Sequence, residues 1–180
     1  MVKRDLIKQL ILWFLLVAGL VGLRVYVFDV LTITEQMANR YLNKNDTVVV
    51  AKQAELTHGD FVLYKVEKEA YVGRIIALPG EQVTYMDDVL YRNDAIIAED
   101  YLRRTQQQEA YTEDLTVDSL TDGRHQKLPK KHFLVLNDNR TDQADSRTFG
   151  LISRKQIVGQ LAFRISPLDQ FGFVQTGLTP

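Results

Sequence analysis

The residue types that most often perform catalysis are sparse in this sequence, and few are spaced to act together. Its 180 residues include no cysteine, which excludes thiol catalysis, disulfides and cysteine-bound zinc. The histidines His58, His125 and His132 lack metal-ligand spacing. There is also no glycine-rich phosphate loop and no Gly-x-Ser-x-Gly sequence. The sequence therefore predicts no bound metal and no cofactor.

Two segments remain as candidates for a functional site. One runs Tyr71-Val-Gly-Arg-Ile-Ile-Ala-Leu-Pro-Gly80, and the other runs Leu136-Asn-Asp-Asn-Arg140 and then Asp145-Ser-Arg-Thr-Phe-Gly150. In the second, acids and arginines alternate at short spacing, which suits a loop held by charge-assisted hydrogen bonds. Asp145–Arg147 and Asp138–Arg140 are the expected pairs. We expect a structural role for eight motif residues: Pro79, Gly80, Asp138, Asn139, Arg140, Asp145, Ser146 and Arg147.

The elements that must position these segments are predicted to be β-strands. Short runs rich in β-branched and aromatic residues alternate with turn residues after residue 30. Strands are expected at 47–51, 60–66, 70–78, 82–86, 89–91, 133–136 and 160–165, with hairpins joining 82–86, 89–91 and 95–97. A short helix is expected at 153–158. The polar stretch 101–131 indicates a cap insertion or an exposed loop.

The first 28 residues predict a membrane anchor. The run from Leu10 to Leu23 carries no charge, and Lys8 and Arg24 near its ends can reach the interface, so one helix is expected over 7–28. A cleaved signal peptide is disfavoured because bulky residues follow Arg24 where a small-residue site is needed. A buried core helix is disfavoured because no polar face is evident. The preceding basic residues place the N-terminus in the cytoplasm and residues 29–180 outside the cell.

The amino-acid composition narrows the class of protein further. The chain is 46% hydrophobic and 25% charged, which is typical of a globular protein of one domain. Its net charge of −1 argues against a broad basic face for nucleic acid, so no nucleic-acid partner is expected. The expected fold is mainly β, preceded by a single membrane helix.

In their order along nearly the whole chain, these features resemble the Gram-positive type I signal peptidases. The similarity rests on the anchor, on the strand and turn ending in Pro79-Gly80, and on the loop from Asn137 to Gly150. Gly59-Asp-Phe-Val62 and the segment from Val158 to Pro167 add to it. The resemblance implies a signal-peptidase-like β body, a Ser–Lys catalytic dyad and exported preproteins as substrates.

The departures from the family pattern fall on that dyad. The family serine precedes a methionine just outside the membrane, where this chain reads Thr34-Glu-Gln-Met37. The family lysine precedes the arginine of the strand, where this chain has Gly73 before Arg74. An amide such as Gln36 is not a nucleophile, and glycine supplies no base. The resemblance therefore implies that no catalytic pair is intact, and the protein is expected to be inactive.

Three hypotheses stay open. In the first, the former cleavage groove binds an extended peptide along a strand edge. Gly73 would enlarge the floor of this groove, whose candidate residues are Thr34, Gln36, Met37, Tyr71, Gly73 and Ile75. In the second, an active peptidase uses a non-standard pair, with Lys44 or Lys52 near the hydroxyl of Thr34. In the third, the protein is a passive anchored scaffold.

The first hypothesis carries a more specific implication. The resemblance extends to the signal-peptidase-like accessory proteins of streptococcal pilus assembly, which have an incomplete dyad. It implies assistance to sortase-dependent polymerisation, with pilin subunits or the pilus sortase as partners.

Overall fold

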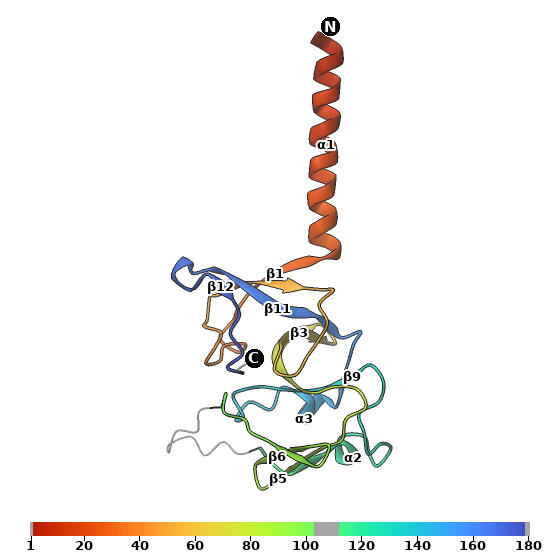
Figure 1. The fold of residues 1–180 in the computed structure, drawn as a ribbon, viewed down its shortest axis with the longest axis vertical. Coiled ribbons are helices and arrows are strands. Elements are labelled where there is room, and N and C mark those ends of the chain that lie inside the picture. The colour runs from red at the N-terminus through yellow and green to blue at the C-terminus, as the bar shows by residue number, and fades with distance from the viewer. Residues whose placement is uncertain (1, 103–111, 179–180) are drawn as a thin grey trace.

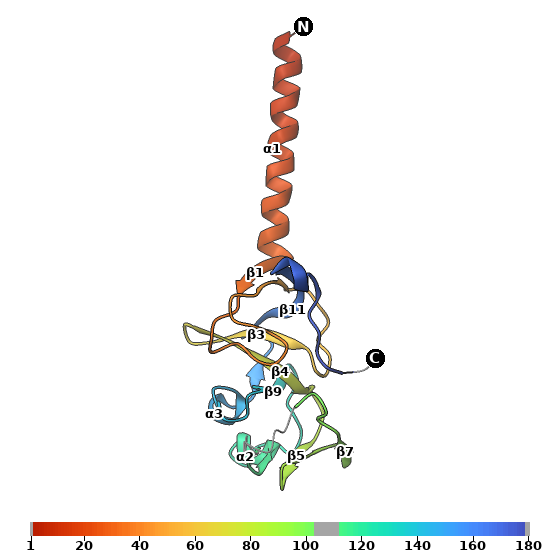
Figure 2. The same cartoon turned by 90° about the vertical axis from the view of Figure 1, so that its left-hand side faces the viewer.

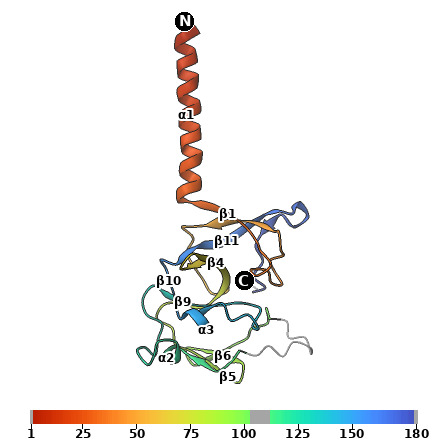
Figure 3. The ribbon, with the colours of Figure 1, turned by 180° about the vertical axis from the view of Figure 1, so that it is seen from behind.

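The computed structural model of the protein describes residues 2–102 and 112–178. Helix α1 (Val2–Tyr26) rises clear of a β body in all views (Figures 1–3). Its segment Leu6–Tyr26 is long and apolar enough to cross a membrane, and the side chains of residues 6–21 are exposed. An apolar helix with no partner in its own chain is typical of a membrane anchor.

The helix ends two residues before the expected limit, because the body caps its last carbonyls. Lys52 Nζ donates to the carbonyl of Val25 at 2.9 Å, and Gln53 Nε2 donates to that of Tyr26 at 3.5 Å. A cation at a helix C-terminus satisfies free carbonyls and complements the helix dipole. Phe28 then begins strand β1 opposite Ala51, so the prediction of one helix over 7–28 is wrong at its C-terminal end.

One large sheet forms most of the body. Its antiparallel order is β1 (Phe28–Thr32), β2 (Thr47–Ala51), β11 (Ile157–Ser166), β3 (Phe61–Val66), β4 (Glu69–Ala77), β9 (His132–Leu136) and β10 (Ile152–Ser153), and β12 (Gly172–Phe173) pairs with β11. Buried residues cluster on both faces of β4: Val72 packs with Ile33 and Phe61, and Ile75 packs with Tyr64 and Val135. Strand β4 therefore lies between two parts of the core.

A small sheet lies at the end of the body farthest from α1 (Figures 1 and 2). Its order is β7 (Ala95–Ile97), β6 (Val89–Arg92), β5 (Val83–Met86) and β8 (Leu115–Thr116), and α2 (Val117–Leu120) follows it. The predicted hairpins are confirmed. The exposed-loop interpretation of 101–131 is wrong for Tyr101, Leu115, Val117 and Leu128, which are buried in the core beneath this sheet. Residues 103–111 lie outside the described part of the chain.

The short helices are not where the sequence suggested. Residues 154–156 form a turn, and Ser153, Ile157 and Val158 lie in β10 and β11, because the amide of Ser153 and its hydroxyl both donate to Gln156 Oε1. Helical turns occur instead at α3 (Ser146–Phe149), beside β9 in Figure 3, and at η1 (Leu168–Gln170). The expected fold class, mainly β after one apolar helix, is confirmed.

Candidate functional site

Gly73, where the resemblance implies the family lysine, is enclosed by its neighbours. Gly73 lies buried in β4 opposite Val62. A Cβ placed on it would lie 2.6 Å from Val135 Cγ1, 3.2 Å from the Leu136 carbonyl oxygen and 3.4 Å from Tyr64 Cε1. Because the first distance is well inside van der Waals contact, a side chain here requires Val135 to move. The expectation that Gly73 enlarges the floor of a groove is wrong, since its neighbours occupy the space.

Tyr64 completes this closure. Its ring stacks on Tyr71 with centroids 5.7 Å apart, and its hydroxyl donates to the Ala144 carbonyl at 3.1 Å. Burial raises the pKa of Tyr64 above its ordinary value, so the phenol stays neutral under physiological conditions. It therefore acts as a hydrogen-bond donor to the loop and does not replace the missing base.

The position of the family serine is an exposed turn. The Met37 amide donates to the Thr34 carbonyl at 3.2 Å, and the side chains of Thr34 and Gln36 face solvent. Met37 is half-buried against the cluster that contains Val72, the residue before Gly73. This packing brings the first motif to the β4 region.

Neither lysine considered as a substitute base has the required environment. Lys44 Nζ pairs with Glu35 at 2.7 Å, and the lysine side chain is 57% exposed. Lys52 is engaged with the carbonyls at the end of α1 and lies 3.6 Å from Asp29. A lysine that activates a nucleophile must be free to contact it, whereas these two lysines are engaged with acids and main-chain carbonyls.

Arg74, next to Gly73, points to the opposite face and is fully buried. Its guanidinium binds Asp138 through two hydrogen bonds of 2.7 and 2.6 Å. Nη1 donates to the carbonyls of Gly59 and Thr176, at 3.0 and 2.6 Å. Its Cζ lies over three rings, at 4.0 Å from that of Tyr101, 4.3 Å from Phe61 and 5.4 Å from Tyr41. A charge paired, hydrogen-bonded and stacked in this way links β4 to five other segments of the body.

Of the two ion pairs expected in the acidic loop, one is present. Asp145 accepts from the Arg147 guanidinium at 2.7 Å and from the Asn137 amide at 2.8 Å, and it caps α3 through the Arg147 amide. The Asp145–Arg147 pair is therefore confirmed. The Asp138–Arg140 pair is wrong, because Arg74 takes Asp138 and Arg140 instead pairs with Glu99 at 2.7 Å.

The remaining motif residues stabilise turns. Ser146 Oγ accepts from the Val135 amide at 3.0 Å, and Asn139 Oδ1 accepts from the Thr141 hydroxyl at 2.6 Å. Gly80, at φ +90°, follows Pro79 in a turn that suits glycine, and its amide donates to the Leu128 carbonyl. Among residues 2–102 and 112–178, no three His, Asp or Glu side chains gather as they would around a metal ion.

Sequence reasoning missed a buried polar cluster between the two sheets. Glu99 Oε1 accepts from Arg140 and from the hydroxyls of Tyr85 and Tyr101, at 2.7, 2.9 and 2.6 Å. Burial raises the pKa of both tyrosines. Glu99 gave no signal in the sequence, because it lies between a short hairpin and a polar stretch and its charged partner, Arg140, is 41 positions along the chain.

One edge of β4 is open beside this site. Strand β9 pairs with β4 only from Arg74 onwards, where Arg74 lies opposite Leu136. Main-chain groups alternate in direction along an antiparallel strand, and the Ile75 amide donates toward β3. The main-chain groups of Val72 and Ala70 therefore point away from β3, and within the described residues no strand pairs with them. An unpaired edge of this kind can accept an extended peptide.

Comparison with known proteins agrees with this geometry. A family model described as signal peptidase, peptidase S26, matches residues 4–166. A signal peptidase I of Bacillus caldolyticus is 32% identical over 169 residues, which are 89% of this chain and 92% of that protein. A Staphylococcus aureus protein named inactive signal peptidase IA is 33% identical over 134 residues, 72% of this chain and 74% of its own length.

A solved structure shows the same relationship. The crystal structure of a signal peptidase I from Enterococcus faecalis V583 is 33% identical, with a TM-score of 0.54, and covers 60% of this chain and 97% of that one. The chain belongs to the signal peptidase, peptidase S26, family. The resemblance drawn from its motifs is confirmed, and the family includes members named as inactive.

Proposed function

We propose that this protein is a membrane-anchored, proteolytically inactive member of the family that binds an extended segment of a pilin subunit or of the pilus sortase and so assists sortase-dependent pilus assembly. The observation that carries the inactivity is the base position, which has no side chain and no room for one. Removing a member of a serine catalytic unit typically lowers kcat by about a million-fold, so substitution at both positions leaves no useful peptidase.

The open edge of β4 supports the binding part of the proposal. Strand addition uses main-chain hydrogen bonds, which the substitutions at positions 36 and 73 leave intact. The amide and carbonyl of Val72 and those of Ala70 are directed to the open side. Met37 and Tyr71 are half-buried, so part of each side chain is available to contact a bound peptide.

A cellular test separates binding at this edge from catalysis. In a strain lacking the gene, we compare wild type, Gln36→Ala, Ala70→Pro and Ala70→Val for surface pilus polymers. Proline removes an amide that faces away from β3, whereas valine keeps it. Pilus polymers are expected with wild type, Gln36→Ala and Ala70→Val, and not with Ala70→Pro present at an equal level. Normal polymers with Ala70→Pro would reject binding at the β4 edge and leave the passive scaffold.

We also propose that the N-terminus is cytoplasmic and that the body is extracellular, as the basic residues before the span indicate. Strands β11 and β12 lie near the end of the body from which α1 rises (Figure 1). In β12 and the connection from β11 to it, the apolar side chains of Leu168, Phe171 and Phe173 are exposed. Exposed aromatic side chains suit a membrane surface. Protease added outside intact protoplasts should digest the body, and a mature N-terminus beyond residue 20 would contradict the retained anchor.

The second candidate is an active peptidase with a relocated pair. Its specific support is the exposed hydroxyl of Thr34, two residues before Gln36. It predicts cleavage of a preprotein by wild type and loss of that cleavage in Thr34→Val. The ion pairs of Lys44 and Lys52 favour the inactive protein over this candidate.

A further inference from the structure

The segment Val174–Leu178, here termed the tail segment, lies extended across the body after β12. The Val174 amide donates to the Ala162 carbonyl at 3.1 Å, and the Thr176 carbonyl accepts from Arg74 Nη1 at 2.6 Å. Val174 packs on the core cluster of Ile33 and Phe61. The tail segment is thus held like a bound peptide, by main-chain hydrogen bonds and a few side-chain anchors.

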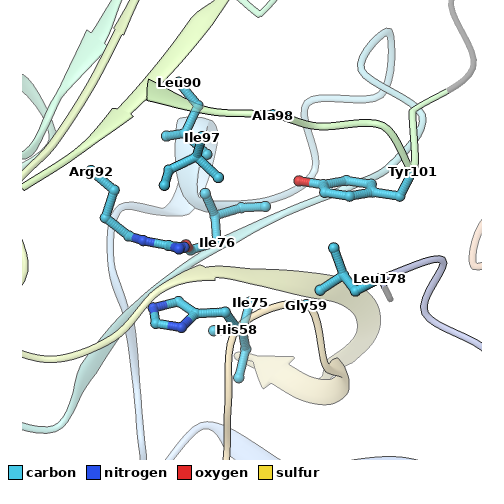
Figure 4. Close-up of a pocket in the computed structure, with 10 residues that line it drawn as sticks. All are labelled: His58, Gly59, Ile75, Ile76, Leu90, Arg92, Ile97, Ala98, Tyr101 and Leu178. Carbon is cyan, nitrogen blue, oxygen red and sulfur yellow. The ribbon is translucent and has the colours of Figure 1, made fainter. Parts of the chain in front are cut away.

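The last anchor is Leu178, which enters an apolar cavity between the two sheets. Figure 4 shows its side chain directed between Tyr101 and Gly59, below Ile76 and Ile97. The cavity keeps an open volume of about 60 Å³ beside Leu178, and its lining is mainly apolar. A site that is larger than its occupant accepts a larger apolar side chain, because filling a cavity gains packing contacts.

Two glycines fit the tail segment to its site. A Cβ on Gly59 would overlap Leu178 Cδ1, and a Cβ on Gly177 would overlap the Tyr41 hydroxyl oxygen. Gly177 is also at φ +72°, which other residues rarely adopt. The site therefore selects an extended segment in which a carbonyl that binds Arg74 is followed by glycine and then by a large apolar residue.

The tail segment makes few buried contacts with the body. Residues 175, 177 and 178 are exposed, and Leu178 is 42% exposed although it is the apolar anchor. A segment with few buried contacts and little main-chain pairing opens at low cost, since local stability follows such contacts. Arg74 would keep Asp138 and Gly59 as partners when the tail segment leaves.

We propose that Tyr41, Gly59, Arg74 and Tyr101 form a second peptide-binding site, separate from the β4 edge, which the tail segment occupies in its own chain. Its ligand is a segment of a partner protein with an extended carbonyl–Gly–large apolar pattern, which displaces the tail segment. The site does not depend on the proposed pilus function, because it needs only the contacts described here.

Binding of a synthetic peptide tests this site directly. The probe is fluorescein-labelled Val-Gln-Thr-Gly-Leu-Thr-Pro, the sequence of residues 174–180. It is added in detergent to the full chain and to a chain that ends at Phe173, and fluorescence anisotropy is measured. Saturable binding to the shortened chain, at least tenfold tighter than to the full chain, is expected because the tail segment competes in the latter. Peptides carrying Gly177→Val or Leu178→Ser should bind at least tenfold more weakly, and Leu178→Phe more tightly.

The full chain with Leu178→Ser keeps the test decisive if the shortened chain does not fold. This variant weakens the occupant alone, so it should bind the wild-type peptide more tightly than wild-type protein does, with slower amide exchange at Gly59 and Arg74. A folded shortened chain that binds no peptide, or binds the Gly177→Val peptide equally well, would overturn the proposal. So would an unfolded shortened chain together with a Leu178→Ser chain that takes up no peptide, because the tail segment would then be an integral part of the fold.

Discussion

The two faces of strand β4 differ sharply at neighbouring residues. On one face Arg74 is paired with Asp138, hydrogen-bonded to two carbonyls and stacked among three rings. On the other face Gly73 has no side chain, and Val135 and Tyr64 fill the space beside it. The arginine side is held by many polar contacts, and the glycine side lacks the lysine that the resemblance to the family implies there. The two faces therefore report on different properties, the first on the fold and the second on the proposed inactivity.

The same difference separates the two motif segments. The loop from Asn137 to Arg147 is dense in hydrogen bonds, with Asp145 alone serving a cap, an amide and a guanidinium. The turn at Thr34–Met37 is exposed and holds only one packed side chain. A match to the family in the loop from Asn137 to Arg147 therefore predicts the fold. Information on activity comes only from the turn at Thr34–Met37 and from Gly73.

The largest effect is expected at Arg74. Replacing it by methionine leaves Asp138 buried without its partner, and breaking a buried ion pair costs about 3–5 kcal/mol of unfolding free energy. Denaturant unfolding of the full chain in detergent measures this loss. Arg92→Met is the matched control, because Arg92 lies 3.8 Å from Glu81, bonds one carbonyl and is only partly buried. Equal losses in the two variants would refute the special role of Arg74.

A somewhat smaller effect is expected between the sheets. Arg140 Nε and Nη1 and Glu99 Oε2 are buried without a hydrogen-bond partner among the described atoms. Arg140→Met or Glu99→Leu alone should lower the free energy of unfolding by about 3 kcal/mol, because each substitution leaves the opposite charge buried without its partner. The double variant should be more stable than either single one, since well-packed apolar residues can replace a buried pair at little cost. Additive losses in the double-mutant cycle would show that the two charges are not coupled.

The stability of the chain should depend on the size of the side chain at position 73. Gly73→Lys is expected to destabilise the chain by about 1–3 kcal/mol, because overpacking moves Val135 and strains the adjacent backbone. Adding Val135→Ala to that variant should recover part of this loss, although Val135→Ala destabilises the wild-type chain. Thermal unfolding of the four proteins measures the coupling, and a Gly73→Lys chain as stable as wild type would show that the base position is open.

The last expected effect is absent at neutral pH and is seen only in alkali. The pKa of Tyr64, Tyr85 and Tyr101 is raised by burial, so in the folded protein they stay protonated above the ordinary tyrosine value of about 10. The unfolded chain releases these protons first, so stability is complete below about pH 10 and falls above it, by about 1.4 kcal/mol per pH unit for each tyrosine. Absorbance of tyrosinate should rise in two stages, and a single stage near pH 10 would contradict the burial.

Sequence patterns predicted the strands well because alternation and turn residues are local properties. Thr47–Ala51 was predicted to the residue, and the hairpins followed from Asp87-Asp88 and Asn93-Asp94, which all adopt positive φ in the structure. Phe28, the first residue of β1, was assigned to the anchor, because it continues an apolar run and only pairing with Ala51 makes it part of a strand.

The site was predictable only in part, for the same reason. Gln36 and Gly73, at the positions where the resemblance implies the dyad, are visible in the sequence, whereas the closure of Gly73 depends on Val135, which is 62 positions away along the chain. The partner of Arg140 could not be predicted, because Glu99 approaches it through the packing of the small sheet on the large one. Long-range packing thus determines whether the space beside Gly73 is open or filled.

Cleavage of a preprotein tests the central account most directly. Wild type, Gln36→Ser/Gly73→Lys and the same pair with Val135→Ala are incubated in detergent with a signal-peptide-bearing substrate, beside an active signal peptidase I. The account predicts no product from wild type, and product from the triple variant in excess of that from the double variant, because Val135→Ala makes room for the lysine. Cleavage by wild type that disappears in Thr34→Val would contradict it.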